Sequence, residues 1–383
     1  MAHHSTVFAQ LLKLVPRHRF EQLAQKHHHG QRFRRTSRWS QFVALAMGQL
    51  SGRCSLRDIV ENAEAQVRRW YHLGVRSIKR STLSRVNNEQ PAQLYEELFG
   101  LLYERCRGLA PRHRFRFKHP LYSLDASVIE LSLRIFPWAK YLHTKGGMKV
   151  HLSLDHSGYI PSFAVLTDGC KNEAPVGRQF DFPPGSVVVF DRGYTDYLWY
   201  KSLTHRGIYF VTRLRKNARY TVLERRRVDR RSGLTSDQTI RLTGPQLRGV
   251  DMPLMRHVGY RDPETGKHYV FLTNAFHLSA RTIAELYKER WQIELFFKWI
   301  KQNLKIKAFV GTSRNAVMTQ IWIALCVSLL VAYLKFISRC AYSAQQLLRL
   351  LQLNLFVRRN LFELLCPPPP LSPHPKPPQL ALL

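Results

Sequence analysis

The chain has 383 residues, 45% of them apolar, so it is long enough for about two or three compact domains with a sizeable core. Lysine and arginine number 59 against 26 aspartates and glutamates, which gives a formal net charge of +33 at pH 7. Charge of this size opposes compaction unless a polyanion neutralises it, so it argues against an ordinary soluble protein and favours a nucleic acid as the partner. An anionic membrane surface is the weaker alternative.

Three features bear on where the protein works. The six cysteines have no zinc-binding spacing, which indicates reduced thiols in a cytoplasmic setting, and we expect no signal peptide because the first residues are charged rather than apolar. Residues 318–334 are almost wholly apolar and marginally long enough to span a bilayer. Gln320 and Ser328 within this run favour a helix buried in a large core, so we expect no membrane association.

Residues 1–110 have the pattern of a helical region. Apolar residues recur at helical spacing from 39 to 50. Ser55 stands three residues before Asp58, which is the spacing of a capping box, and Ser81 indicates a further helix start. Short capped helices that carry arginines are typical of helix-turn-helix DNA readers, although a plain helical bundle with solvated arginines explains the pattern equally well.

Residues 111–214 have the pattern of strands. Five runs of apolar and β-branched residues predict strands; they lie at 121–125, 149–154, 159–165, 187–190 and 208–211. The second and third are expected to pair as a hairpin, and the run at 187–190 is continuously apolar, which is typical of a strand buried on both faces. A helix is expected at 194–203.

The remaining residues divide into three parts. Residues 215–277 alternate short β-like runs with turns, which predicts a β-rich insertion on the surface, and its dense arginines favour a role in facing DNA. Residues 278–365 begin with a strong helix from 279 to about 303 and continue into the apolar helix. Residues 366–383 are rich in proline, so we expect a disordered or extended tail.

Two aspartates lie in strongly apolar surroundings. Asp125 is flanked by apolar residues in an expected strand, and Asp191 directly follows the buried strand at 187–190. A buried carboxylate costs several kcal/mol unless charge compensates it, and two of them on neighbouring strands would repel each other unless a divalent cation lies between them. The alternative is that each aspartate caps a strand end or pairs with an arginine such as Arg192.

A third acidic residue lies on the strong helix. Tyr287, Arg290, Glu294 and Lys301 fall within an arc of roughly 60° when a helix advances about 100° per residue, so they form one stripe. One interpretation is an exposed salt-bridge face, because Arg290 and Glu294 are four residues apart. In the functional interpretation Glu294 completes a metal site, while Arg290 and Lys301 bind phosphates.

The spacing Tyr-x₂-Arg-x₃-Glu-x₆-Lys resembles the signature of bacterial insertion-sequence transposases of the DDE type, in the insertion-sequence-four family. Segments that resemble this family's blocks around its first and second aspartates follow in the right order; they are Leu124-Asp125-Ala126-Ser127, Phe136-Pro137-Trp138-Ala139-Lys140, Thr167-Asp168-Gly169 and Phe190-Asp191-Arg192-Gly193-Tyr194. The resemblance covers about residues 40–335. One departure is that Cys170-Lys171-Asn172-Glu173 stands where relatives often have His-Asp.

The resemblance implies an α/β fold with a ribonuclease H-like catalytic core at 111–214 and 278–365. A β-rich insertion at 215–277 would interrupt this core, and an all-helical DNA-binding region at 1–110 would precede it. Catalysis would rest on Asp125, Asp191 and Glu294, which would bind two Mg²⁺ ions, with Mn²⁺ able to substitute. The candidate DNA contacts are Tyr287, Arg290, Lys301, Arg192, Lys298, Arg215 and Lys216.

The implied reaction is cut-and-paste transposition by a homodimer acting on double-stranded DNA. The enzyme would nick the terminal inverted repeats of its element, form and open a hairpin there, and join the ends to target DNA. Hairpin-forming members can place an aromatic residue beside a flipped base, and here Tyr220, Tyr260, Tyr269 or Phe271 would serve. Two alternatives remain open: an inactive DNA-binding protein or repressor derived from a transposase, and a nuclease of ribonuclease H type without a joining step.

Overall fold

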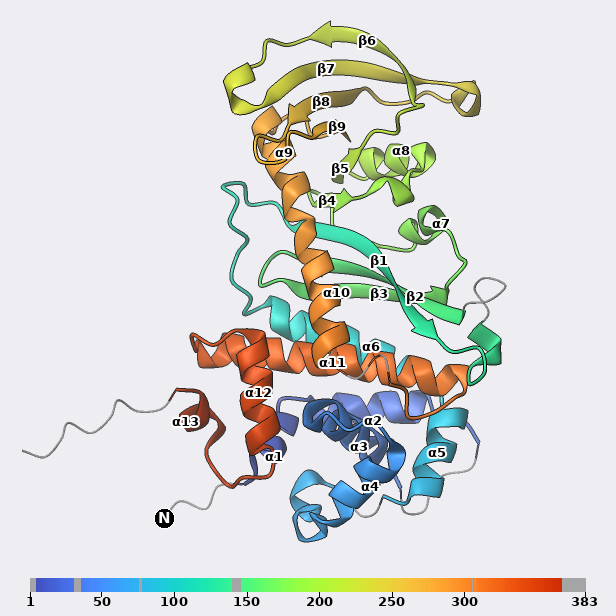
Figure 1. Ribbon diagram of the computed structural model, residues 1–383, viewed down its shortest axis with the longest axis vertical. Coiled ribbons are helices and arrows are strands. Elements are labelled where there is room, and N and C mark those ends of the chain that lie inside the picture. The colour runs from blue at the N-terminus through green and yellow to red at the C-terminus, as the bar shows by residue number, and fades with distance from the viewer. Residues whose placement is uncertain are drawn as a thin grey trace, which may run out of the picture.

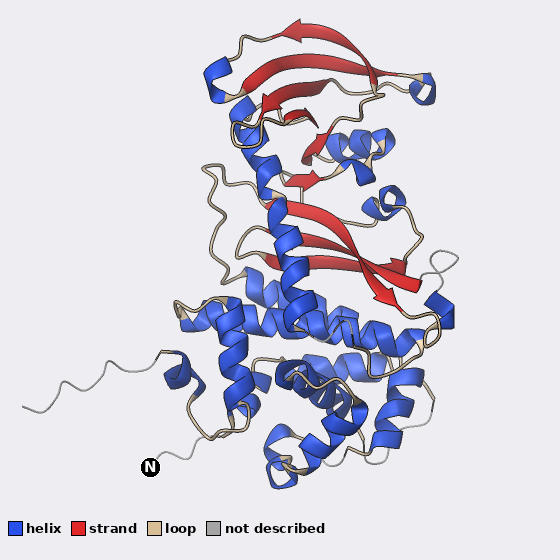
Figure 2. Cartoon of the chain, viewed as in Figure 1, coloured by secondary structure: helices blue, strands red, loops and turns tan. Residues whose placement is uncertain are grey.

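A computed structural model describes residues 5–30, 36–75, 78–139, 146–304, 306 and 308–366 of the chain. Helices form the lower half of the molecule in Figure 1 and one long sheet rises above them, with helices α9 (Ala280–Glu289) and α10 (Trp291–Asn303) running up along the sheet. Figure 2 shows the same division between strands above and most helices below. Except for its first residue, the expected proline-rich tail at 366–383 lies outside the described residues.

The helical half is built from both ends of the chain. Its N-terminal helices are α1 (Val7–Leu12), α2 (Arg17–Lys26), α3 (Arg38–Ser51), α4 (Leu56–Glu64), α5 (Arg80–Glu89) and α6 (Gln93–Arg107), with short turns η1 (Val67–Arg69) and η2 (Tyr71–Leu73). The C-terminal helices are α11 (Arg314–Ser338), α12 (Ala344–Asn354) and α13 (Leu361–Leu365). Both sets share one apolar core, in which the rings of Phe99 and Trp322 lie 5.6 Å apart. The two ends of the chain therefore stabilise each other.

The helix boundaries follow the expected caps only in part. Helix α3 ends at Gly52, whose φ of 70° is one that glycine adopts without strain. Ser55 caps α4 by accepting a hydrogen bond from the Asp58 amide at 3.0 Å, but the described contacts include no bond from Asp58 back to Ser55. The helix expected near Ser81 is present as α5, but it begins at Arg80, so Ser81 is not its cap, and the N-cap residue, Lys79, makes no side-chain cap.

The strands form one nine-stranded sheet in the order β3-β2-β1-β4-β5-β9-β8-β7-β6. Their bounds are β1 (Leu121–Leu131), β2 (Gly146–Asp155), β3 (Ile160–Asp168), β4 (Val187–Phe190), β5 (Tyr209–Arg213), β6 (Arg219–Arg225), β7 (Leu234–Thr243), β8 (Met255–Arg261) and β9 (His268–Thr273). β4 is parallel to both of its neighbours, β1 and β5, whereas all other neighbouring strands are antiparallel. The five strands expected at residues 111–214 are present as β1 to β5, and the expected hairpin is formed by β2 and β3.

Residues 215–277 extend this sheet instead of forming a separate layer. β9 returns along the open edge of β5, with Thr273 opposite Val211, and β8, β7 and β6 follow in turn. Asn274 fastens the junction, because its side chain accepts from the Phe210 amide at 2.8 Å and donates to the Ile208 carbonyl at 2.9 Å. Strands form here as the pattern predicts, but their continuity with the central sheet was not expected.

Helices cover both faces of the central strands. Val188 and Phe190 of β4 pack in one cluster with Trp199 of α8 (Tyr197–His205), whereas Val187 and Val189 pack in another cluster with α9. Because both faces are covered, every residue of β4 is apolar and buried, as predicted. The remaining short helices are α7 (Glu173–Gly177), η3 (Pro137–Ala139), η4 (Arg192–Tyr194), η5 (Arg230–Ser232) and η6 (Pro245–Leu247).

The single helix predicted from 279 to about 303 is divided at Arg290. The Arg290 amide donates to the Tyr287 carbonyl at 3.3 Å, and the Arg290 carbonyl accepts from the Ile293 amide at 3.1 Å. Both bonds span three residues instead of the four of an α-helix, so the helix tightens for one turn between α9 and α10. Arg290 lies in this break.

Helix α11 is the long apolar helix of the chain. By length and composition it is the one candidate for a membrane span among the described residues, but 67% of its most apolar window is buried inside the protein. Gln320 accepts from the Val310 amide at 2.9 Å and donates to the Ala308 carbonyl at 2.8 Å, while Ser328 donates to the Leu325 carbonyl at 2.7 Å. The polar groups of Gln320 and Ser328 thus have hydrogen-bond partners within the protein. Helix α11 is the buried core helix that the sequence predicted.

Truncation of Leu329, which is fully buried in α11, tests this packing. Leu329→Ala should lower the free energy of unfolding by about 2–5 kcal/mol, because it leaves a cavity in the core. Urea unfolding of the purified protein measures the loss. Leu353→Ala, on α12 where the side chain is 81% exposed, is the matched control and should change this free energy by less than about 0.5 kcal/mol. Equal losses in the two variants would contradict the buried position of α11.

Candidate active site

Asp125 and Asp191 lie on neighbouring parallel strands. Leu124 of β1 is paired with Phe190 of β4, so each aspartate stands one residue beyond a paired position. Neighbouring strands are about 4.8 Å apart. The sheet register therefore brings the backbones of the two aspartates together although they are far apart in the chain.

The Asp125 carboxylate is partly deprived of water and surrounded by other charges. Its pKa is raised to about 6, chiefly by burial and in part by the charges of Asp191 and Glu294. Arg290 and a 2.8 Å hydrogen bond from the Ala126 amide oppose this rise in the pKa. Asp191 and Glu294 are thus both close enough to influence Asp125, and burial outweighs the stabilisation that Arg290 provides.

Arg290 joins two of these three carboxylates. Its Nη1 donates to Oδ2 of Asp125 at 3.1 Å, and its Nη2 donates to Oε1 of Glu294 at 2.5 Å. The guanidinium carbon lies 5.6 Å from the centre of the Tyr287 ring, which is a cation–π distance. Its Nε is buried without a hydrogen-bond partner in the described part of the chain. An aspartate paired with an arginine was the expected alternative at this position, but the arginine is Arg290 and not Arg192.

The polar stripe on α9 and α10 faces the sheet. The side chains of Arg290 and Glu294 are only 14% and 32% exposed, so the interpretation of an exposed salt-bridge face is wrong. Further along α10, the Nζ of Lys301 donates to Oγ of Ser127 at 2.6 Å and to the carbonyl of Val128 at 2.9 Å. The stripe therefore runs alongside β1, from Asp125 towards the C-terminal end of this strand. Helical spacing predicted that these residues share one face of the helix, but it could not predict what that face would contact.

Asp191 stands at the start of the short helix η4. Its Oδ1 accepts a hydrogen bond from the Gly193 amide at 2.8 Å, so it also has the capping role that was the expected alternative. A Cβ atom at Gly193 would collide with Oε2 of Glu173 and lie 3.0 Å from Oδ1 of Asp191. Glu173 is therefore a neighbour of Asp191, and burial together with the charge of Asp191 raises the pKa of Glu173.

Glu173 is a carboxylate near the site that the sequence did not single out. It opens α7 and pairs with Lys149 of β2 at 3.5 Å. His151, also on β2, hydrogen-bonds the hydroxyl of Tyr194 at 3.2 Å, and burial followed by nearby lysine charge lowers the pKa of His151 to about 4. The one signal for Glu173 in the sequence was that it belongs to the segment Cys170-Lys171-Asn172-Glu173, which stands where relatives often have His-Asp. No spacing rule could have found these groups, because they come from three different elements.

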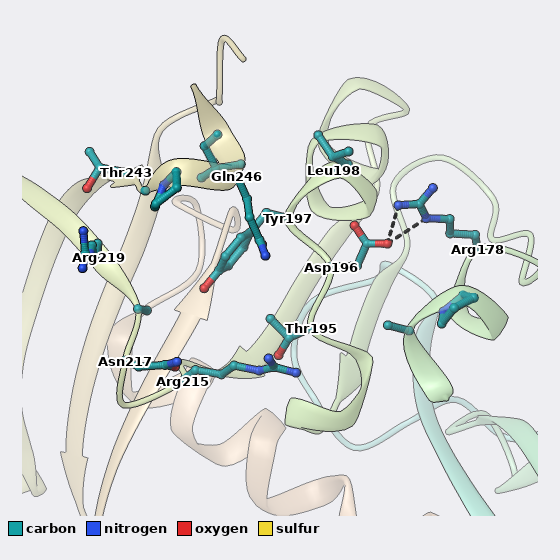
Figure 3. Close-up of a pocket in the computed structure, with 16 residues that line it drawn as sticks. Arg178, Thr195, Asp196, Tyr197, Leu198, Arg215, Asn217, Arg219, Thr243 and Gln246 are labelled. Carbon is teal, nitrogen blue, oxygen red and sulfur yellow. Dashed lines mark hydrogen bonds and ion pairs between the residues drawn. The ribbon is translucent and has the colours of Figure 1, made fainter. Parts of the chain in front are cut away.

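A hollow of about 950 Å³ adjoins the segment that follows Asp191 (Figure 3). It lies between the start of α8 and the segment that joins β5 to β6, and the ring of Tyr197 and the chain of Arg215 lie within it (Figure 3). Arg178 pairs with Asp196 at one side, at 2.5 Å. Arg215 donates to the Arg192 carbonyl at 3.5 Å. Two of the candidate DNA contacts, Arg192 and Arg215, are thus neighbours, and Arg215 lines this hollow.

The other two candidate DNA contacts are exposed. Lys216 follows Arg215 in the segment before β6, and Lys298 lies on the outer side of α10. Neither lysine makes a hydrogen bond or ion pair with the three carboxylates among the described contacts. Both are therefore free of the internal pairing that holds Arg290, and their charge is presented to solvent.

The donor set of the site is made of carboxylate oxygens, which are the ligands that Mg²⁺ prefers. Within the described ranges, no three His, Cys, Asp or Glu side chains converge closely enough to hold an ion together. At this site Arg290 bonds to both Asp125 and Glu294. The carboxylates therefore fit a hard divalent cation in their chemistry, on condition that Arg290 releases them.

Acidic residues at one end of adjacent parallel strands, in a chain of net charge +33, are typical of enzymes that cleave nucleic acids. Comparison with known proteins agrees with this class. The family described as the transposase DDE domain matches residues 116–330, and the chain belongs to this family. The protein is a transposase, an enzyme that acts on DNA. A second family, described as a domain of unknown function (DUF4372), matches residues 3–76.

Relatives that span most of the chain are named as transposases. A Sinorhizobium fredii protein with the name transposase y4zB is 32% identical over 299 residues, which are 77% of this chain and 82% of the relative. The Geobacillus stearothermophilus transposase of the insertion sequence element IS5377 is 31% identical over 258 residues, which are 66% of this chain and 67% of the relative. Among solved structures, a cryo-EM structure of a piggyBac transposase synaptic complex with hairpin DNA is similar at a TM-score of 0.44 and 13% sequence identity. The matched region includes 96% of this chain and 81% of the piggyBac chain.

The raised pKa of Asp125 makes stability depend on pH. Its carboxyl group binds a proton more tightly in the folded protein, with a pKa of about 6 against an ordinary 3.8, so this group favours folding at low pH and loses that effect as the pH rises through 6. In EDTA, Asp125→Asn should therefore be more stable than the wild type by roughly 1–3 kcal/mol at pH 8 and about equally stable at pH 4.

Urea unfolding at both pH values measures this difference. Asp181→Asn is the control, because its side chain is 86% exposed, and it should shift the free energy of unfolding by less than about 0.5 kcal/mol at either pH. A loss of stability in Asp125→Asn that is the same at pH 4 and pH 8 would contradict a carboxylate whose burial outweighs the stabilisation from Arg290.

Proposed function

We propose that this transposase moves a bacterial insertion sequence by cut-and-paste, and that it is of the insertion-sequence-four type. The observation that carries the proposal is Arg290, which bonds Asp125, 165 residues away in the sequence, and Glu294, four residues further along the chain. Asp125 lies in the segment that resembles the first aspartate block of that family, and Arg290 and Glu294 lie in its Tyr-Arg-Glu-Lys spacing. Two motifs that are distant in the chain meet in one place.

The strand order supports a ribonuclease H-like core. The antiparallel strands β3, β2 and β1, followed by the parallel strands β4 and β5, make the mixed five-stranded sheet that this fold implies. Strands β6 to β9 stand where the resemblance implies an insertion. Helices α1 to α6 stand where it implies a DNA-binding region.

We assign the metal site to Asp125, Asp191 and Glu294, which would hold two Mg²⁺ ions, with Mn²⁺ able to substitute. The ions, when bound, would supply activation of a water or DNA 3′-hydroxyl and stabilisation of the leaving oxygen. Arg290 meanwhile neutralises two of these carboxylates. Once released, its guanidinium would bind phosphate oxygens, and its buried, unpartnered Nε would gain an acceptor.

Basic residues around the carboxylates would hold the DNA backbone. Lys301 on α10 and Arg290 just before this helix both bond to groups of β1, and the Arg290 guanidinium carbon lies 5.6 Å from the centre of the Tyr287 ring. The proposed contacts further out are Arg192, Arg215, Lys216 and Lys298. The substrates would be the double-stranded terminal inverted repeats of the element and the target DNA.

The proposal extends to assembly. A homodimer would bring two element ends together on the bacterial nucleoid in the cytoplasm, with the N-terminal helices reading the repeats. Exposed arginines on or beside these helices support such a role; they are Arg53, Arg57, Arg80 and Arg85. The net charge of +33 supports it as well, because the charge requires a polyanion to neutralise it.

Substitution of each carboxylate tests the catalytic assignment. Asp125→Asn, Asp191→Asn and Glu294→Gln should each slow Mg²⁺-dependent nicking of the element ends at least about 1000-fold, because each removes a charge that would hold an ion. The dissociation constant for end DNA should change less than about threefold. Gel assays with labelled ends measure both quantities, and EDTA should abolish nicking.

Glu285→Gln is the matched control, because this carboxylate lies on α9 with 48% of its side chain exposed, and it should nick at the wild-type rate. Nicking that survives one of the three changes would remove that residue from the site. A wild-type protein that binds ends but never nicks them would be a repressor derived from a transposase. One that nicks but does not join pre-cut ends to target DNA would be a nuclease.

Removal of exposed positive charge tests the DNA surface. Lys216→Gln and Lys298→Gln should each lower the slope of log affinity against log salt concentration by about 1, because each would remove one phosphate contact. Fluorescence anisotropy with end DNA at several salt concentrations measures the slope. Arg349→Gln, an exposed residue on α12, is the control and should leave the slope unchanged. Equal slopes in all three variants would place the DNA elsewhere.

A further inference from the structure

The break between α9 and α10 is held from two sides by two consecutive residues. Arg290 bonds to the carboxylate of Asp125 on β1 and to that of Glu294 on α10. Glu289, immediately before it, is only 4% exposed and bonds to other parts of the chain. Because consecutive Cα atoms are held about 3.8 Å apart by a rigid peptide, the position of one residue constrains the other.

Glu289 is fixed by two partners from distant segments. Its Oε1 accepts a hydrogen bond from the Tyr159 hydroxyl at 2.7 Å, and its Oε2 pairs with Arg114 in the segment before β1. A carboxylate this deeply buried is costly unless charge and hydrogen bonds compensate it. Glu289 therefore cannot move away from Tyr159 and Arg114 without a large penalty.

Tyr159 itself is anchored in a tight turn. It is one of two described non-glycine residues with positive φ, at 53°, and Gly158 before it has φ of 76°. A Cβ atom at Gly158 would lie 2.5 Å from Cζ of Phe336 on α11, so the turn between β2 and β3 is packed against the core helix. A strained backbone of this kind persists only where its surroundings fix it. The Tyr159 hydroxyl is thus a rigid reference point for α9.

We propose that Tyr159, Glu289 and Arg114 form a clamp that positions Arg290 at the carboxylates. The inference rests on the proposed function, since it assigns a role in DNA cleavage to residues that touch neither the carboxylates nor, by this proposal, the DNA. The backbone changes to three-residue hydrogen bonds between α9 and α10, where Glu289 and Arg290 follow each other. Glu289 is held by Tyr159 and Arg114, whereas Arg290 is held by the two carboxylates. Tyr159, Glu289 and Arg114 are positioning residues, and Arg290 is the group through which they act.

Tyr159→Phe is the sharpest variant, because it removes one hydroxyl and keeps the ring, the turn and the Arg114 pair. It should slow single-turnover nicking of end DNA at saturating Mg²⁺ by about tenfold, since small misplacements of a catalytic group can cost up to about 100-fold. Its dissociation constant for end DNA should stay within about twofold of the wild type. Glu289→Gln keeps an acceptor for Tyr159 but loses the charge facing Arg114, so its nicking rate should also fall.

Tyr95→Phe is the matched control for a merely structural role. The Tyr95 hydroxyl on α6 also donates to a buried side-chain oxygen, Oε1 of Gln41 on α3, at 2.9 Å, and both residues belong to the helical half. Thermal unfolding establishes the loss of stability in each variant, and nicking is measured well below both midpoints. The control should nick within about twofold of the wild type even where it loses as much stability as Tyr159→Phe.

A double-mutant cycle separates action through Arg290 from a general effect. In an Arg290→Lys background, Tyr159→Phe should slow nicking by less than about twofold, because the group that it positions is already gone. If Tyr159→Phe and Tyr95→Phe slow nicking equally, the inference is overturned while the proposed function stands. If the wild-type protein nicks no end DNA in Mg²⁺, the proposed function fails and the clamp fails with it.

Discussion

The concentration of negative charge where β1 and β4 meet α10 is the constraint on which the site depends. Asp125 is buried among the charges of Asp191 and Glu294, and burial raises its pKa to about 6. Arg290 is the counter-charge that the fold itself supplies, through bonds to Asp125 and Glu294. The break between α9 and α10 falls at Arg290, so the chain leaves regular helical geometry at the residue that carries this positive charge.

The carboxylates lie on elements that are packed into a large apolar core. The helical half, with α11 at its centre, shares this core with strands β1 to β3 and helix α10. Asp125 on β1 lowers stability at neutral pH, because burial raises its pKa to about 6. A protein can retain such a costly group where its function needs it, provided that the rest of the fold is well packed and locally consistent.

The outer strands are tied to the same frame as the carboxylates. β9 pairs directly with β5, which pairs with β4, so the basic segment from Arg215 onward is connected to Asp191 through an unbroken ladder of hydrogen bonds. The hollow that Arg215 lines lies between this segment and the start of α8. A separately packed insertion could shift relative to the carboxylates, whereas strands of one sheet hold their distance and register.

The sequence by itself determined the local features: the five central strands, the continuous apolar burial of β4, the core character of α11, the need for a polyanionic partner and the transposase family. The strands, the burial of β4 and the core character of α11 follow from periodicity within a few residues, the partner follows from the net charge, and the family follows from the resemblance of short motifs. Only the tertiary structure decided that Arg290 pairs with Asp125, that Glu173 lies beside Asp191, that Glu289 is clamped by Tyr159 and Arg114, and that the outer strands continue the central sheet. Contacts between distant segments depend on strand register and helix packing, and no local pattern encodes the partner of a buried charge.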